Sequence, residues 1–242
     1  MEPNHPQHLE QAEKPAPNVT PMVPLTEDMA LARLKQRDLS TEAIEEIALN
    51  SGLIKSRKVR VLLASHPSAP RRISLQLIRQ FHTFELMQFA LRPEAPADLR
   101  RIAEELLISR VMSLPLGECL SLARRSSQMV AGALLLHPEI RVWQAALQNP
   151  RITERTIIKA LGQTAASPAL VQSLSRNPKW VSRADIRLAL LQNPYTPPAL
   201  AVELSLGLPV AHLRDVLQSK RLPEHVREGL RRIVEAANRR EI

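Results

Sequence analysis

Cationic side chains in the middle of the chain are the residues best suited to chemistry in this sequence. Residues 106–202 hold 11 Lys and Arg against 4 Asp and Glu, whereas residues 1–105 hold 14 of each and residues 203–242 hold 8 against 6. On one surface, such groups would attract phosphates or an acidic protein, whereas on a solvated face they would only maintain solubility. The candidate basic binding surface comprises Arg124, Arg125, Arg141, Arg151, Arg155, Lys159, Arg176, Lys179 and Arg183.

Residues suited to catalysis or metal binding are sparse. His66 and His137 each precede a proline, and no HExxH spacing accompanies either of them. The favoured interpretation is a ring that hydrogen-bonds a free helix-terminal carbonyl, rather than a metal ligand or an acid–base group. The acids of residues 106–202 are not paired by spacing, and Ser126 and Ser127 lack a nucleophile elbow. We therefore expect no catalytic residue, no metal, no cofactor and no enzymatic activity.

Arginine also recurs at matched positions along the chain. Arg60 and Arg187 each precede a proline by seven residues, and Arg141 precedes one by nine. A guanidinium group forks readily onto the carbonyls or carboxylates of a neighbouring helix. We expect these side chains, like Arg100 and Arg227, to tie successive helix pairs together more often than they read phosphates.

Cysteine and tryptophan usage narrows the alternatives further. Cys119 is the sole cysteine, so an intrachain disulfide and a multi-cysteine metal site are excluded, and it is expected to be a small core residue. Trp143 and Trp180 fall in apolar contexts. This placement argues against a stacking platform for single-stranded nucleic acid, although not against binding to a duplex backbone.

The stretch Asp185–Pro198, which reads DIRLALLQNPYTPP, shows how the chain positions these groups. Its apolar residues recur at spacings of three and four, so they share one helix face. Pro194 then disfavours further helix. We expect a left-handed conformation at Asn193, a helix cap at Thr196 and a helix start at Pro197.

Apolar periodicity and proline punctuation predict an all-α fold made of short antiparallel helices joined by short connections. Six prolines before residue 26 indicate a disordered leader over residues 1–25, followed by a helical domain over residues 26–242. Thr26 is expected to cap the first helix. The predicted helices are Glu27–Arg37, Thr41–Leu49, Ser56–Ser65, Arg71–Gln80, Phe84–Leu91, Ala97–Ser109, Leu116–Arg125, Gln128–His137, Glu139–Gln148, Thr153–Leu161, Pro168–Arg176, Arg183–Gln192, Pro198–Leu206, Ala211–Ser219 and Glu224–Arg239.

Two parts of the chain align without a gap. Residues 40–107 align with residues 167–234 at a constant offset of 127, and turn prolines and apolar positions coincide in this alignment. His137-Pro138 and Asn149-Pro150 echo the helix stops expected at His66-Pro67, Asn177-Pro178 and Asn193-Pro194. The outer copies are expected at about residues 38–109 and 165–239, with a diverged middle module at about residues 110–164.

The repeated pattern V/I-R-x-x-L-x-x-[NH]-P-x-x-P resembles the leucine-rich repeat variant family and its HEAT-like relatives. It occurs as VRVLLASHPSAP at Val59–Pro70 and as IRLALLQNPYTP at Ile186–Pro197. The resemblance implies a right-handed α-solenoid of the HEAT-like or armadillo type that serves as an interaction surface. Some family members carry a cysteine-ligated iron–sulfur cluster, which cannot be carried over to a chain whose only cysteine is Cys119.

Function is expected to follow this architecture. The leading hypothesis is a non-enzymatic scaffold that binds another protein through its concave face. The alternative is binding to a nucleic-acid duplex backbone through the arginine-rich middle module. A HEAT-like DNA glycosylase, to which Trp143, Trp180 and Asp185 bear a superficial likeness, is less favoured. The longest apolar run is Met129–Leu136 and no signal peptide is visible, so no membrane association and a cytoplasmic location are expected.

Overall fold

The computed structural model describes residues 25–163, 166–220 and 222–239, and every regular element within these residues is a helix. The predicted all-α fold is thereby confirmed. The predicted leader lies outside the described residues apart from Leu25. Within the described ranges, no helix combines the length and the hydropathy that crossing a bilayer requires.

The helices fall into three consecutive groups along the chain. The first group is α1 (Glu27–Arg33), α2 (Thr41–Leu49), α3 (Ser51–Ile54), α4 (Arg57–Ser65), α5 (Arg71–Gln80), α6 (Thr83–Ala90) and α7 (Ala97–Arg110). The second is the 3-10 helix η1 (Val111–Ser113), α8 (Leu116–Arg125), α9 (Gln128–Leu134), α10 (Ile140–Leu147) and α11 (Glu154–Leu161). The third is α12 (Pro168–Ser175), α13 (Pro178–Val181), α14 (Ala184–Leu191), α15 (Pro198–Ser205), α16 (Val210–Gln218) and α17 (Glu224–Asn238).

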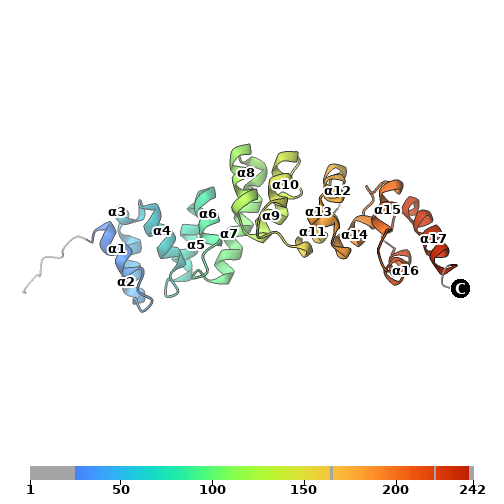
Figure 1. Ribbon diagram of the computed structural model, residues 1–242. Coiled ribbons are helices and arrows are strands. Elements are labelled where there is room, and N and C mark those ends of the chain that lie inside the picture. Colours follow the sequence, from blue (N-terminus) through green and yellow to red (C-terminus); the bar gives the residue numbers. More distant parts are fainter. Residues whose placement is uncertain (1–24, 164–165, 221, 240–242) are drawn as a thin grey trace, which may run out of the picture.

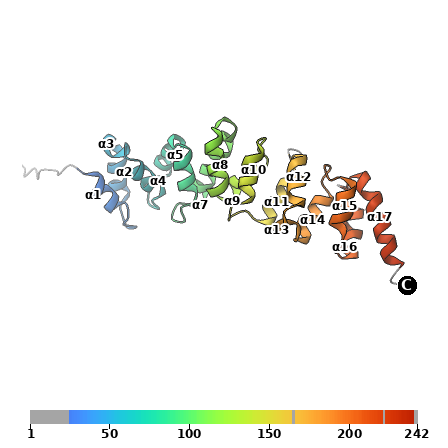
Figure 2. The same ribbon diagram turned by 45° about the horizontal axis from the view of Figure 1, so that its top comes forward.

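These helices follow one another in chain order along an elongated row, with α1 at one end and α17 at the other (Figures 1 and 2). One line of neighbouring helices runs α4, α5, α7, α9, α11, α14, α15 and α17, and a shorter line runs α8, α10 and α12. A single apolar core extends from Ala30 to Val234. It is built from Leu, Ile, Val and Ala, whose small side chains allow short helices to pack closely.

The starts of the first and third groups of helices are spaced regularly. Helices α2 to α7 begin at residues 41, 51, 57, 71, 83 and 97, and α12 to α17 begin at residues 168, 178, 184, 198, 210 and 224. Each start in the second series lies 127 residues after its counterpart. The offset between the aligned parts of the sequence is therefore also the offset between corresponding helices.

Two short α-helices, α3 and α13, were not predicted. The helix stop expected at Asn177-Pro178 is confirmed, because α12 ends at Ser175, but Asn177 also caps α13 and Pro178 is its first residue. The Asn177 Oδ1 atom accepts the Lys179 N–H at 3.1 Å, and Asn50 caps α3 in the same way. Proline is favoured at a first helical position, where its missing N–H costs nothing, so the same dipeptide that ends one helix begins another.

The turn around Asn193 also differs from expectation. Among the described residues, no residue other than glycine has a positive φ, so the left-handed conformation predicted for Asn193 is wrong. Thr196 does not cap α15, because its buried hydroxyl donates to the carbonyl of Leu190 at the end of α14. The cap position belongs to Pro197 and the first helical position to Pro198. A helix-terminal carbonyl accounts for the position of Thr196, since its hydroxyl is used to pair that carbonyl. The predicted cap at Thr26 is confirmed.

Candidate functional site

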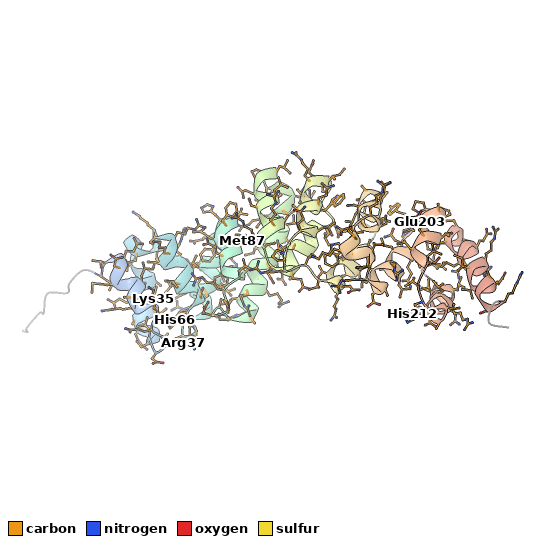
Figure 3. All side chains as sticks on the ribbon, viewed as in Figure 1. Lys35, Arg37, His66, Met87, Glu203 and His212 are labelled. Carbon is orange, nitrogen blue, oxygen red and sulfur yellow. The ribbon has the colours of Figure 1, made fainter. Side chains whose placement is uncertain are left out.

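His66 shows how the turns connect successive helices. Its Nδ1 accepts the N–H of Ser68 at 3.2 Å, so the Nε2 of the neutral ring carries the proton. That Nε2 donates to the carbonyl of Gln36, at 2.8 Å and 30 residues earlier in the chain. The side chain lies close to the α1–α2 end of the row (Figure 3). The expected hydrogen bond between this ring and a free carbonyl is confirmed.

Asn149 and Asn193 make the same pair of bonds with an amide. Each Oδ1 accepts the N–H two residues ahead, at 2.8 and 2.9 Å. Each Nδ2 donates at 2.8 Å to a carbonyl of an earlier helix, that of Ala123 in α8 and that of Leu161 in α11. His66, Asn149 and Asn193 are all buried. We call these three side chains the inter-helix joints, because each joins a turn to a main-chain carbonyl of an earlier helix or of the connection that follows one.

His137 makes only the first of these two bonds. Its Nδ1 accepts the N–H of Glu139 at 3.1 Å, which again places the ring proton on Nε2. Within the described ranges, no hydrogen-bond partner faces that Nε2, and the side chain is half-buried. His137 therefore resembles His66 in its turn bond, but its Nε2–H makes no bond to a carbonyl among the described residues.

Arg227 shows the same kind of connection with a guanidinium group. Its Nη1 donates to the carbonyl of Leu217 at 2.6 Å, and its Nη2 donates to those of Ser219 and Leu222, both at 3.2 Å. Its Nε pairs with Glu224 at 3.0 Å. The side chain thus fastens α17 to the end of α16 and the following turn.

The matched arginines also connect helices. Arg187 Nη1 donates to the carbonyl of Leu206, just beyond α15, at 2.8 Å. Arg60 Nη2 pairs with Glu85 of α6 at 2.7 Å, and the other oxygen of that buried carboxylate accepts the N–H of His82 at 2.8 Å. These contacts agree with the expectation that arginines at these positions tie helices together.

A groove of about 1050 Å³ lies over α7, α9 and α11. Residues of α7 and α11 spaced four apart line it, because such residues share one helix face: Arg100, Glu104 and Ile108 on α7, and Arg155 and Lys159 on α11. The small residues Gly132 and Ala133 of α9 lie between them, which keeps the groove open. A Cβ atom at Gly132 would stand 2.5 Å from Thr156 Cγ2, so glycine permits the close approach of α9 to α11.

Positive charge dominates the groove. Arg100, Arg151, Arg155 and Lys159 line it against the single carboxylate of Glu104. In the part of the chain that the structure describes, none of the four cations is in an ion pair, and the only hydrogen bond that their side chains make joins Arg151 Nη1 to the carbonyl of Arg125 at 3.2 Å. The Nε of Arg100 is buried and unpaired, as are those of Arg60 and Arg187, so this atom does not distinguish the groove. The four cations without ion-pair partners make the groove suited to an anionic ligand.

Apolar side chains accompany these cations. Ile108, Leu136, Met112 and Met129 line the groove, and the two methionines are 72% and 41% exposed. Flexible methionine side chains adapt to varied apolar partners. The groove therefore combines charge recognition with an adaptable apolar contact.

The nine residues of the candidate basic surface are divided among several places. Arg151, Arg155 and Lys159 lie in the groove. Two of the other six are in ion pairs, Arg141 with Glu139 at 3.1 Å and Arg183 with Glu154 at 3.2 Å. Lys179 Nζ lies 4.5 Å from the centre of the Trp180 ring, and Arg176 lines a smaller hollow of about 510 Å³ beside Trp143. Arg124 and Arg125 are exposed at the end of α8.

Two groove residues, Arg100 and His137, were predicted to be structural. The spacing of Arg155 and Lys159 is readable in the sequence, because four residues make about one helical turn. No comparable signal distinguishes His137 from His66, since both precede a proline. Whether a side chain finds a carbonyl depends on the neighbouring helix, which lies outside the local motif.

Chemistry elsewhere in the described residues is limited. They contain no group of three or more His, Cys, Asp or Glu side chains arranged to hold a metal ion. Cys119 is buried, with its Sγ 3.5 Å from the carbonyl of Val111, and burial together with the charge of Glu118 raises the pKa of its thiol. A raised pKa disfavours the reactive thiolate, so Cys119 is a core residue rather than a nucleophile. Trp143 and Trp180 are buried as well.

Comparison with known proteins adds no family assignment. The chain matches no protein-family model, and neither the curated proteins nor the solved structures yield a match. The functional argument therefore depends on the groove and on the chemistry of its residues.

Proposed function

We propose that this chain is a non-enzymatic α-solenoid scaffold, similar to HEAT-like and leucine-rich repeat variant proteins, that binds an acidic segment of another protein. The binding site is the groove over α7, α9 and α11. The observation that carries the proposal is the combination of four cations, none in an ion pair among the described residues, with apolar side chains in one open groove.

The arrangement of the helices supports the scaffold part of the proposal. Helices packed in chain order, with two series of starts separated by a constant 127 residues, are typical of repeat proteins, in which each unit buries the apolar face of its neighbour. Such proteins present one extended surface along the row. The groove occupies the middle of that surface, between helices that belong to different units.

Charge and polarity favour a protein segment as the occupant. An acidic segment would complement Arg100, Arg155 and Lys159, while its apolar residues would pack on Met112 and Met129. The groove volume suits side chains rather than a duplex, and a duplex backbone is normally bound by cations distributed along its length. Several of the other cations on this protein are already ion-paired, as Arg141 and Arg183 are.

The test is selection of peptides from a displayed random library on the wild-type protein and on the double variant Arg155→Glu/Lys159→Glu. Acidic peptides with apolar residues should be enriched on the wild type, and the variant should bind them about a hundredfold more weakly. Both side chains are exposed, so the circular dichroism spectrum should not change. The matched control is Arg124→Glu/Arg125→Glu, which makes the same change of charge outside the groove and should bind as the wild type does.

Nucleic acid is the competing occupant, and the same variants distinguish it. Duplex DNA and duplex RNA are titrated at rising salt concentrations. Binding of a duplex that weakens steeply with salt, together with no selected peptide, would contradict the proposal. Equal peptide binding by the groove variant and its control would also overturn it, because the groove would then not be the site.

A further inference from the structure

We infer that Arg100 and His137 form a carboxylate-binding subsite within the groove, which receives an Asp or Glu side chain of the partner. This inference rests on the proposed function and specifies what the groove recognises. It follows from comparing Arg100 with Arg227 and His137 with His66, because Arg227 and His66 use their side-chain donors to bind main-chain carbonyls.

Arg100 is the counterpart of Arg227, at the same place in α7 as Arg227 occupies in α17. The side chain of Arg227 binds three carbonyls and Glu224, whereas the side chain of Arg100 makes no hydrogen bond or ion pair within the described residues. The residues that lie 127 positions before the three whose carbonyls Arg227 binds are Ala90, Arg92 and Ala95, and Ala90 lines the groove.

His137 differs from His66 in a parallel way. Both rings accept a main-chain N–H on Nδ1, so both present a proton on Nε2. The Nε2 of His66 donates to Gln36, whereas that of His137 has no acceptor in the part of the chain that the structure describes. His137 and Arg100 both line the groove. Two side chains whose counterparts bind carbonyls thus bring unused donors to the lining of one groove.

These donors require oxygen acceptors, and a carboxylate fits them best. A guanidinium group binds the two oxygens of a carboxylate in a forked arrangement, and a neutral imidazole N–H adds a further donor. Four cations against the one carboxylate of Glu104 attract anionic groups to the groove. The proposed partner, an acidic segment of a protein, offers carboxylates, so the occupant of the subsite is an acidic side chain.

The first experiment measures fluorescence anisotropy with a labelled acidic peptide selected on the wild type. Arg100→Gln should weaken binding by about tenfold to a hundredfold, because a charge-assisted bond is lost. His137→Asn should weaken it by about threefold to tenfold. The asparagine Oδ1 can accept the same main-chain N–H, as it does at Asn149, but the shorter side chain has no N–H in the position of the His137 Nε2–H. Both variants should keep the melting temperature of the wild type.

Arg227→Gln is the matched control. It should lower the melting temperature, because it removes the bonds between α17 and the end of α16, and should leave peptide affinity unchanged. If Arg100→Gln instead lowers the melting temperature to the same extent and leaves affinity unchanged, Arg100 is a structural residue and the inference is wrong. If Arg155→Glu/Lys159→Glu abolishes peptide binding while Arg100→Gln and His137→Asn do not weaken it, the proposed function stands and the subsite does not exist.

A second experiment does not depend on any peptide. The Arg100 Nε–H and the His137 ring signals are followed by NMR while N-acetylglutamate or inorganic phosphate is added. N-acetylglutamate should shift both sets of signals, and phosphate should have the smaller effect. Absence of a shift with N-acetylglutamate, or a larger shift with phosphate, would overturn the assignment to a carboxylate.

Discussion

The groove and the inter-helix joints use the same residue types for different purposes. At the joints, His66, Asn149 and Asn193 are buried and bind main-chain carbonyls earlier in the chain, and Arg227 also binds carbonyls near the end of the row. In the groove, His137 and Arg100 leave donors unpaired among the described residues. A residue that is structural in one turn becomes available for binding in another when the neighbouring carbonyl is out of reach.

The largest difference between the two regions should appear in stability. Asn149→Ala removes a fully buried amide that pairs with Ala123, Ser126 and the N–H of Arg151, so it should lower the free energy of unfolding by about 3 kcal/mol. The melting temperature should fall by about 6–12 °C. His137→Ala should cost about 1 kcal/mol or less, because only one bond of a half-buried ring is lost. Calorimetry checks both values, and equal losses would remove the distinction between joint and groove.

The ion pair between Arg60 and the buried Glu85 tests the connection between α4 and α6. Glu85→Gln keeps the shape of the side chain but removes the charge that Arg60 Nη2 contacts at 2.7 Å. We expect a loss of about 2 kcal/mol, measured by urea denaturation. The matched control is Glu105→Gln, which breaks an exposed pair with Arg101 and should cost less than about 0.5 kcal/mol. A similar effect of the two substitutions would show that burial of Glu85 contributes little.

The close approach of α9 to α11 can be tested from the groove side. Gly132→Ala would place a Cβ atom 2.5 Å from Thr156 Cγ2, and relieving that overlap should cost about 1–3 kcal/mol. Thr156→Ser removes the clashing methyl group, so the double variant should regain most of the stability. Thermal denaturation of both single variants and the double variant measures the coupling. Additive effects would mean that the two side chains do not meet.

The smallest expected effect concerns Cys119. Burial and the charge of Glu118 raise the pKa of its thiol, so less thiolate is present at a given pH than for a free cysteine. Alkylation by iodoacetamide at pH 8 should be slower by about tenfold or more in the folded protein than in urea. Mass spectrometry measures the rate, and equally rapid labelling in the two states would contradict the burial of this side chain.

Much of the helical structure was predictable from sequence. The predicted helices all begin within one residue of the observed starts, because caps, prolines and apolar spacing are local signals. Helix α9 ends at Leu134 rather than at His137, and α13 was not predicted. A four-residue helix is too short to show a period, and a proline can begin a helix as well as follow one.

The groove was only partly predictable. Arg151, Arg155 and Lys159 belong to the basic surface proposed from charge, but Arg100 was assigned a structural function together with Arg227. The two arginines occupy matched positions, but only the side chain of Arg227 bonds main-chain carbonyls among the described residues. Such bonds depend on the backbone of a neighbouring helix, so the local sequence around Arg100 contains no sign of the difference.

The packing of helices in chain order has a mechanical consequence. The joints connect residues 23 to 32 positions apart, and the extensive helix contacts likewise link near neighbours along the row. Because these connections are short-range, the row would bend by small rotations that add from one helix pair to the next. Bending would open or narrow the space between α7 and α11, so a segment that contacts both helices would resist bending and stiffen the middle of the molecule.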